Sequence, residues 1–126
     1  NVLFPTRATH MGEGWETRRS RGANHDWLIV RLGRPATIVE IEVDTNHFKG
    51  NFPESCWLEG VDAPDGADPK ELDGWFPLLP RTKLRGHTRH YFASELSNLE
   101  RPVAHVRLSI HPDGGIRRLR VLGAPL

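Results

Sequence analysis

The sequence predicts an all-β protein, an antiparallel β-sandwich of the jelly-roll type, and three observations predict this class. Apolar residues recur at every second position in several short runs, which is the period of a strand with one buried face. Clusters of Pro, Gly and Asp separate these runs, as turns do in sandwiches. No apolar pattern of helical period continues beyond two turns, because Pro or Gly interrupts each candidate helix.

The first two strands are predicted at residues 27–32 and 37–45, where alternate positions are apolar. Between them, Gly33-Arg34-Pro35 has the composition of a turn, since Pro35 restricts φ and has no N–H to donate. The sequence therefore predicts two separate strands joined by a turn.

Two further strands are predicted near the C-terminus, at residues 105–111 and 116–122. Val106, Leu108 and Ile110 alternate with polar residues in the first of these runs. The Pro-Asp-Gly-Gly sequence within residues 111–115 is typical of a hairpin turn between two strands.

The middle of the chain is less regular. Residues 75–79 and 90–92 are predicted to add strands, with residues 81–89 as a polar connection between them. Residues 63–74 are rich in Asp, Pro and Gly, which predicts an exposed loop with a short helical turn at residues 69–72.

The alternation also predicts which side chains fill the core. The expected inward positions are Leu28, Val30, Val39, Ile41, Val43, Val106, Leu108, Leu119 and Val121. Glu40, Glu42 and Asp44 then form a carboxylate stripe on the opposite face of their strand, which is expected to be solvated. A divalent metal ion at this stripe is the one cofactor that the pattern leaves open, and no residue is assigned as a metal ligand.

Length and composition limit the classes of function. The 126 residues are enough for one domain, and a formal net charge of +1 argues against a nucleic acid or a membrane surface as partner. No apolar run approaches the roughly 20 residues that span a bilayer, and no signal peptide opens the chain. Cys56 is a single cysteine in a strand-like run and is expected to be a small buried hydrophobe, which favours a cytoplasmic setting.

Two groups of motifs resemble known families. Residues 26–33, 106–112 and 119–123 are similar to the discoidin-type, galactose-binding-like domains, which are eight-stranded jelly rolls. More specifically, five motifs in order resemble allantoicase, at residues 14–19, 25–27, 42–45 with 47–51, 78–81, and 112–115 with 118–121. The second resemblance covers nearly the whole chain and implies one jelly-roll repeat, residues 1–126, of a longer protein with two repeats.

The allantoicase resemblance implies a hydrolase of purine degradation that converts allantoate to ureidoglycolate and urea. It also implies a second repeat of the same protein as a partner, and a homo-oligomer. Allantoate is a small anion that carries two ureido groups on one carbon. Cleaving a ureido C–N bond requires a group that holds the carboxylate, an acid for the departing nitrogen and a base for water.

The resemblance and the residue types together indicate the candidate site residues. The catalytic candidates are His47, His25, Glu16 and Asp44, and the substrate-binding candidates are Arg18, Arg19, Asn51, Asp113 and Arg117. Some of them have a structural alternative: His47 could fix its own turn, and Arg18 and Arg19 could form a solvated ion-pair cluster with Glu16. Arg117 shares the parity of Leu119, so it should be buried against either a structural carboxylate or the substrate.

Two other functions stay open at this stage. One is a non-catalytic, discoidin-type module that binds a carbohydrate or another ligand, which would need aromatic residues at the loop tips. The four tryptophans are instead expected to pack in the core or to anchor loops. The other is a catalytically silent repeat that builds the oligomer.

Overall fold

A computed structural model describes residues 15–16, 25–64 and 66–126. These residues are almost entirely strands and loops, and a 3-10 turn, η2, covers Pro69–Glu71. The strands are β1 (Trp15–Glu16), β2 (Asp26–Asp44), β3 (Ser55–Val61), β4 (Phe76–Lys83), β5 (Arg89–Phe92), β6 (Val103–His111), β7 (Gly115–Ile116) and β8 (Arg118–Pro125). Every described pairing is antiparallel, which confirms the predicted fold class.

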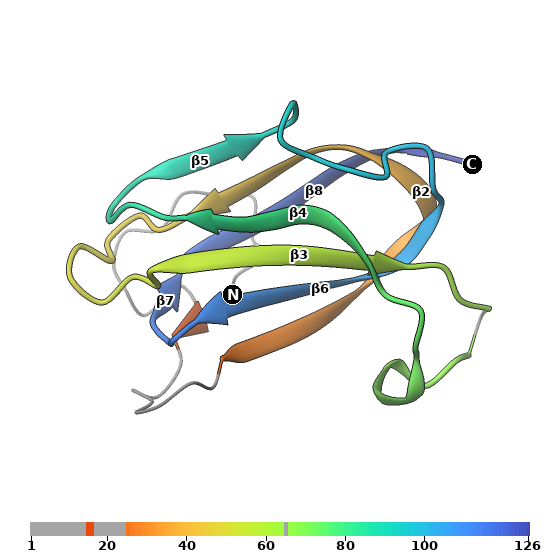
Figure 1. Cartoon of the computed structure of the whole chain (residues 1–126), viewed down its shortest axis with the longest axis horizontal. Coiled ribbons are helices and arrows are strands. Elements are labelled where there is room, and N and C mark those ends of the chain that lie inside the picture. Colours follow the sequence, from red (N-terminus) through yellow and green to blue (C-terminus); the bar gives the residue numbers. More distant parts are fainter. Residues whose placement is uncertain (1–14, 17–24, 65) are drawn as a thin grey trace.

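The long strand β2 organises the sandwich because it belongs to both layers (Figure 1). Its first part, residues 26–31, pairs with β6 and thereby joins the first layer, which has the order β4-β3-β6-β2. Its last part, residues 36–44, forms the second layer, in which it pairs with β8 on one side and, from Ile41 onward, with β5 on the other. The sheet is therefore one surface that curls over the core, and β1 with β7 forms a separate two-stranded sheet.

The turn predicted at Gly33-Arg34-Pro35 is wrong, because β2 continues through these residues without ending. The ladder between β2 and β6 is interrupted between Arg31 and Ala36, where the strand passes from one layer to the other. Proline is tolerated at such a point, since the interrupted ladder requires no N–H from it. A composition typical of turns here marks a bend within a strand.

The hairpin predicted at residues 111–115 is also wrong. Strand β6 pairs with β2 and β3, whereas β8 pairs with β2, so the connection leads from one layer to the other. On the way, Gly115 and Ile116 pair with Glu16 and Trp15. The Pro-Asp-Gly-Gly sequence supplies a sharp change of direction, but the partners of the two strands lie elsewhere.

Most of the predicted core is confirmed. Ile41, Val43, Val106, Leu108 and Leu119 are buried, and Leu28, Val30 and Val121 are partly buried against the same cluster. Val39 is the exception, with 55% of its surface exposed, because the register between β2 and β8 shifts between Ile38 and Glu40. Such a bulge reverses the alternation, so Ile38 takes the inward position that the sequence pattern assigns to Val39.

The remaining expectations about the fold can be compared in the same way. The predicted strands at residues 75–79 and 90–92 correspond to β4 and β5, and the predicted helical turn corresponds to η2. Cys56 is fully buried, and burial raises the pKa of its thiol to about 12. Trp27 is 51% exposed, so of the two places expected for the tryptophans, the core and the loop anchors, it does not occupy the core. Among the described residues, no helix has the length and apolar character needed to cross a membrane.

Candidate functional site

The curl of β2 brings its two ends to the same end of the sandwich (Figure 1). His25 precedes the strand and Asp44 ends it, and β7 lies at this same end. Three segments that are distant in the chain meet there: Glu16 pairs with Gly115, and the Gly115 N–H donates to the Asn51 carbonyl over 2.8 Å. Described residues of these three segments therefore lie together at this end of the sandwich.

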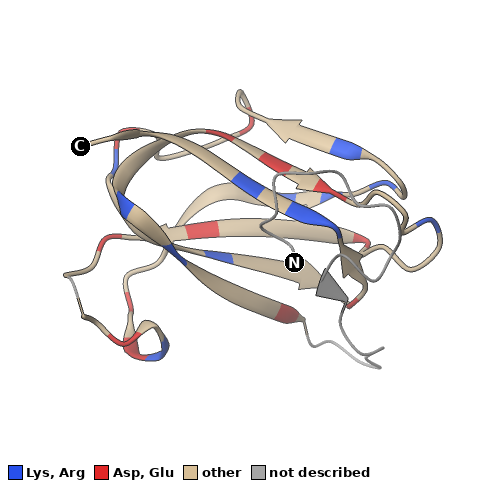
Figure 2. Ribbon diagram, turned by 180° about the vertical axis from the view of Figure 1, so that it is seen from behind, with Lys and Arg blue, Asp and Glu red and all other residues tan. Residues whose placement is uncertain are grey.

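The carboxylate stripe on β2 is largely buried, so the expectation of a solvated face is wrong for Glu42 and Asp44. Glu42 is 2% exposed and Asp44 is fully buried. Both strands that neighbour this part of β2, β5 and β8, carry basic residues beside it (Figure 2). The sequence pattern could not show this because the basic partners come from β5 and β8, far away in the chain.

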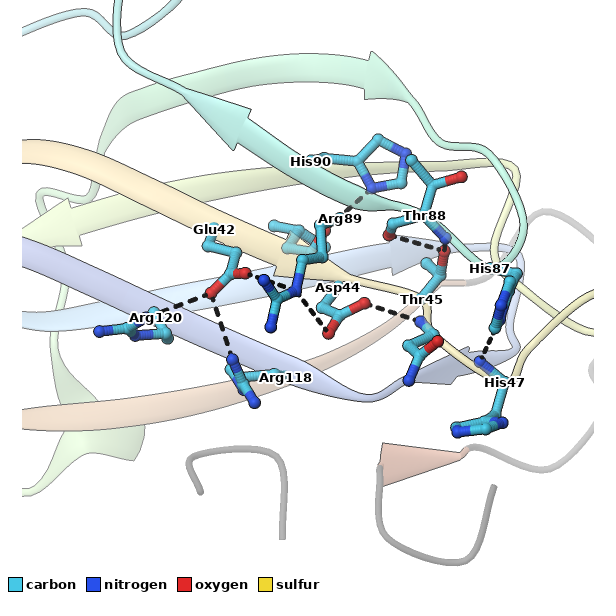
Figure 3. Close-up of polar contacts among 12 residues, drawn as sticks. Glu42, Asp44, Thr45, His47, His87, Thr88, Arg89, His90, Arg118 and Arg120 are labelled. Atoms are coloured by element: carbon cyan, nitrogen blue, oxygen red, sulfur yellow. Dashed lines mark hydrogen bonds and ion pairs between the residues drawn. The ribbon is translucent and has the colours of Figure 1, made fainter. Parts of the chain in front are cut away.

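Three arginines surround the Glu42 carboxylate (Figure 3). Its Oε1 lies 3.5 Å from Arg89 Nε, and its Oε2 lies 3.7 Å from Arg118 Nη1 and 3.8 Å from Arg120 Nη1. Asp44 Oδ1 accepts a 2.8 Å hydrogen bond from the Asn46 N–H, and Oδ2 lies 3.9 Å from Arg89 Nε. We call Glu42, Asp44, Arg89, Arg118 and Arg120 the carboxylate–arginine cluster.

The loop that follows Asp44 is joined by hydrogen bonds to the loop between β4 and β5. Thr45 Oγ1 donates to the Arg85 carbonyl over 2.6 Å and accepts from the Thr88 N–H over 3.0 Å. The His47 N–H donates to His87 Nδ1 over 2.8 Å, and the two rings meet edge to face. Both histidines have positive φ, 70° for His47 and 50° for His87, which is uncommon for residues other than glycine. Backbone outliers gather at functional sites, so this contact marks the two loops as a candidate site.

A buried phenylalanine also fixes the position of this loop. Phe48 is fully buried, and its ring occupies the space where a side chain at position 115 would begin. Gly114 has φ of 130°, and a Cβ there would lie 2.7–2.9 Å from backbone atoms of residues 51–53. Glycine is therefore required at both positions, by the close approach at 115 and by the conformation at 114.

Several predicted site residues belong to this end of the sandwich. Arg117 is buried as predicted, and its N–H donates to the Asp44 carbonyl over 2.7 Å. Asn51 accepts from Gly115, and Asp113 is half-buried in the connection that leads to β7. The backbone of Glu16 pairs in β1, whereas Arg18 and Arg19 lie outside the described residues.

His25 lies outside the carboxylate–arginine cluster. It is exposed, and its ring packs on Trp57 of β3 with 4.9 Å between ring centroids. The Trp57 ring also lies 5.9 Å from the guanidinium of Arg81. This contact places His25 on the outer surface of the first layer.

His90 has a structural role beneath the cluster. Its Nε2 accepts from the Arg85 N–H over 2.9 Å, so the ring is neutral and Nδ1 donates to the Val43 carbonyl over 2.9 Å. Burial lowers the pKa of His90, because it disfavours the charged ring, and the nearby Arg85 acts in the same direction.

The metal site that the sequence leaves open receives little support. Within the described ranges, no group of three or more His, Cys, Asp and Glu side chains is arranged to hold a metal ion. The Glu42 carboxylate has three arginines around it, which oppose the approach of a further cation.

Four residues at this end of the sandwich were not identified as site residues from the sequence: His87, Arg89, Arg118 and Arg120. The available signal was charge complementarity, since Arg118 and Arg120 alternate with Leu119 and Val121 as the acidic residues of β2 alternate with its apolar ones. Two stripes of opposite charge on neighbouring strands would pair across a ladder. No sequence signal connects His87 with His47.

A curled antiparallel sandwich with polar loops gathered at one end defines a galactose-binding-like jelly roll. Its fold is similar to the crystal structure of an F5/8 type C domain from Bacteroides fragilis, with a TM-score of 0.62, 19% identity, and coverage of 94% of this chain and 78% of that chain. At this identity the similarity concerns the fold alone.

The chain belongs to the allantoicase repeat family, whose model matches residues 1–126. It is 46% identical over 123 residues to allantoicase from Dictyostelium discoideum, which covers 96% of this chain and 33% of that protein. It is also similar to a crystal structure of allantoicase from Saccharomyces cerevisiae, with 38% identity, a TM-score of 0.81, and coverage of 97% of this chain and 35% of that chain. The chain thus spans about a third of the length of these relatives.

Proposed function

We propose that the protein containing this repeat is an allantoicase, which hydrolyses allantoate to ureidoglycolate and urea in purine degradation. The names of its relatives and the match of the family model support this activity. In the reaction, water forms a C–O bond to the central carbon while one ureido C–N bond breaks. A base takes a proton from the water, and an acid gives a proton to the departing urea nitrogen.

One observation supports the chemistry above the others: paired carboxylates and arginines adjoin a contact between two loop histidines. The carboxylate–arginine cluster ends at Asp44, and His47 and His87 meet directly beyond it. Arginines suit the substrate carboxylate, while a histidine or carboxylate can exchange protons with water and nitrogen. We assign acid–base roles to His47 and Asp44 and substrate binding to Asn51, Asp113 and Arg117.

The assembly is part of the same proposal. A chain that spans a third of its relatives leaves room for a second repeat, and we propose that repeat and a homo-oligomer as its partners. We also propose a cytoplasmic setting, in keeping with a single cysteine that is buried and protonated.

Urea release tests the proposal. The full-length protein and the isolated repeat are each incubated with allantoate, with and without added divalent metal ions, and urea is measured over time. The expected result is release by the full-length protein. Absence of release under all conditions overturns the proposed activity, and release by the isolated repeat would show that the second repeat is dispensable.

A hollow on the outer face of the first layer favours a second candidate function, that of a ligand-binding module. An open hollow of about 360 Å³ lies there, lined by Trp57, Glu59, Pro77, Leu79, Pro80 and Arg81. A partly exposed indole next to an arginine is a surface on which a sugar ring could stack. Tryptophan fluorescence during titration with neutral and amino sugars tests this candidate, and an unchanged spectrum contradicts it.

A further inference from the structure

One edge of the buried Arg118 guanidinium has no partner among the described residues. Arg118 is 1% exposed, and its Nη1 lies 3.7 Å from Glu42 Oε2. Its Nε and Nη2 have no hydrogen-bond partner in the described part of the chain. These two nitrogens form the side of the guanidinium that can donate two parallel hydrogen bonds to one carboxylate.

In Arg107 the same edge of the guanidinium, formed by Nε and Nη2, binds a carboxylate. Its Nε and Nη2 both lie 3.0 Å from Glu59 Oε1, on the outer face of the first layer. The Arg107 side chain is more exposed to solvent than that of Arg118, so an unpaired guanidinium would cost less free energy at Arg107. Because a buried polar group without a partner is costly, the open edge of Arg118 requires an explanation.

Two carboxylate oxygens near Arg118 also lack a hydrogen-bond donor among the described residues. They are Glu42 Oε2 and Asp44 Oδ2, and both are buried. Asp44 is the ladder partner of Arg118, and Glu42 lies two residues before it on the same face of β2. A ligand here would find a fork of two donors close to two acceptors, which suits a carboxylate next to N–H groups.

The position is connected to the surface. The side chains of Arg89 and Arg120, which contact the same Glu42 carboxylate, are 37% and 47% exposed. The cluster therefore runs from a buried pair, Glu42 and Arg118, to a solvated rim. A small anion can approach from that rim under the attraction of its positive charges.

We propose that Arg118 binds the carboxylate of the substrate through Nε and Nη2, while Glu42 and Asp44 accept hydrogen bonds from ureido N–H groups. This assignment rests on the proposed allantoate hydrolysis and specifies how its site recognises the substrate. It gives the carboxylate to Arg118 and leaves Arg117 to other contacts at the site.

The test compares two lysine variants of the full-length protein. Arg118→Lys keeps the charge but loses the fork, so KM for allantoate should rise about tenfold to a hundredfold, with kcat changed only a few-fold. Arg107→Lys is the matched control, since Arg107 uses the same edge of its guanidinium to bind Glu59 on the outer face of the first layer, away from the cluster, and its kinetics should stay as in the wild type. Melting temperatures of both variants are measured alongside.

Several outcomes would overturn the assignment. An unchanged KM in a folded Arg118→Lys variant does so, as does a rise in KM for Arg117→Lys but not for Arg118→Lys. If Arg118→Lys does not fold, Arg118→Gln replaces it, with the same expected rise in KM. A wild-type protein that releases no urea contradicts the proposed function itself, whereas urea release with unchanged KM in the variants contradicts only this inference.

Discussion

The backbone N–H of His47 donates to Nδ1 of His87 over 2.8 Å, although the two residues lie 40 positions apart. This bond requires an unprotonated Nδ1 on His87, so in the neutral ring its proton is on Nε2. It also joins two loops whose histidines both have left-handed backbone conformations. The His47 ring is therefore presented from a loop with a fixed position, as an acid or base needs.

Replacement of His47 should remove catalysis without removing the fold. We expect His47→Asn in the full-length protein to lower turnover of allantoate by about 10²-fold or more, the usual size of acid–base catalysis. Asparagine tolerates a positive φ, so the backbone conformation at this position should persist. Turnover is measured by urea release, and the melting temperature serves as the control. A folded variant with turnover close to the wild type would assign the acid or base elsewhere.

The bulge at Val39 predicts effects of very different size for Val39 and Ile41, two residues of β2. Ile41→Ala empties a fully buried position and should lower the free energy of unfolding by about 2–5 kcal/mol. Val39→Ala alters an exposed side chain and should change it by about 0.5 kcal/mol or less. Chemical denaturation of both variants measures this contrast. Equal losses would place Val39 in the core after all.

The contact between Phe48 and Gly115 predicts that a single methyl group will disturb the loop. In Gly115→Ala the new Cβ would overlap the Phe48 ring, so the free energy of unfolding should fall by about 1–3 kcal/mol. Gly50→Ala is the matched control on the same loop, because a Cβ there meets nothing within 4 Å. Denaturation midpoints decide, and a stable Gly115→Ala variant would contradict the described packing.

The buried ring of His90 predicts a loss of stability in mild acid. The pKa of His90 in the folded protein lies below its ordinary value of 6.5, because burial disfavours the charged form. The unfolded chain therefore binds the proton first, and stability falls as the pH drops below about 6.5 toward the folded pKa. Above that range His90 should contribute no pH dependence to the free energy of unfolding.

The free energy of unfolding measured between pH 8 and pH 5, about the range over which histidines titrate, checks this prediction. His90→Gln should flatten the dependence, whereas His25→Gln, which alters an exposed ring, should preserve it. An equally steep dependence in His90→Gln would assign the effect to another group.

Part of the site was predictable because each of these residues adjoins a strand that can be recognised from its own sequence. His47 follows a strand whose apolar alternation is clear, and Arg117 precedes another, so both could be located at strand boundaries. The burial of Glu42 and Asp44 was not predictable in this way, because alternation shows which residues share a face but not what covers it. Likewise, the partner of His47 comes from a loop 40 residues away.

By itself, the sequence determined that the protein is all-β, which residues alternate toward the core, and to which family its motifs point. Each of these depends on local composition, since strand period and motif order are properties of neighbouring residues. The tertiary structure decided that β2 curls through Pro35 into both layers, that Val39 bulges outward, and that Arg118 faces Glu42. These features depend on the register between distant strands, where a shift of one residue reverses every side chain, so only the paired strands could settle them.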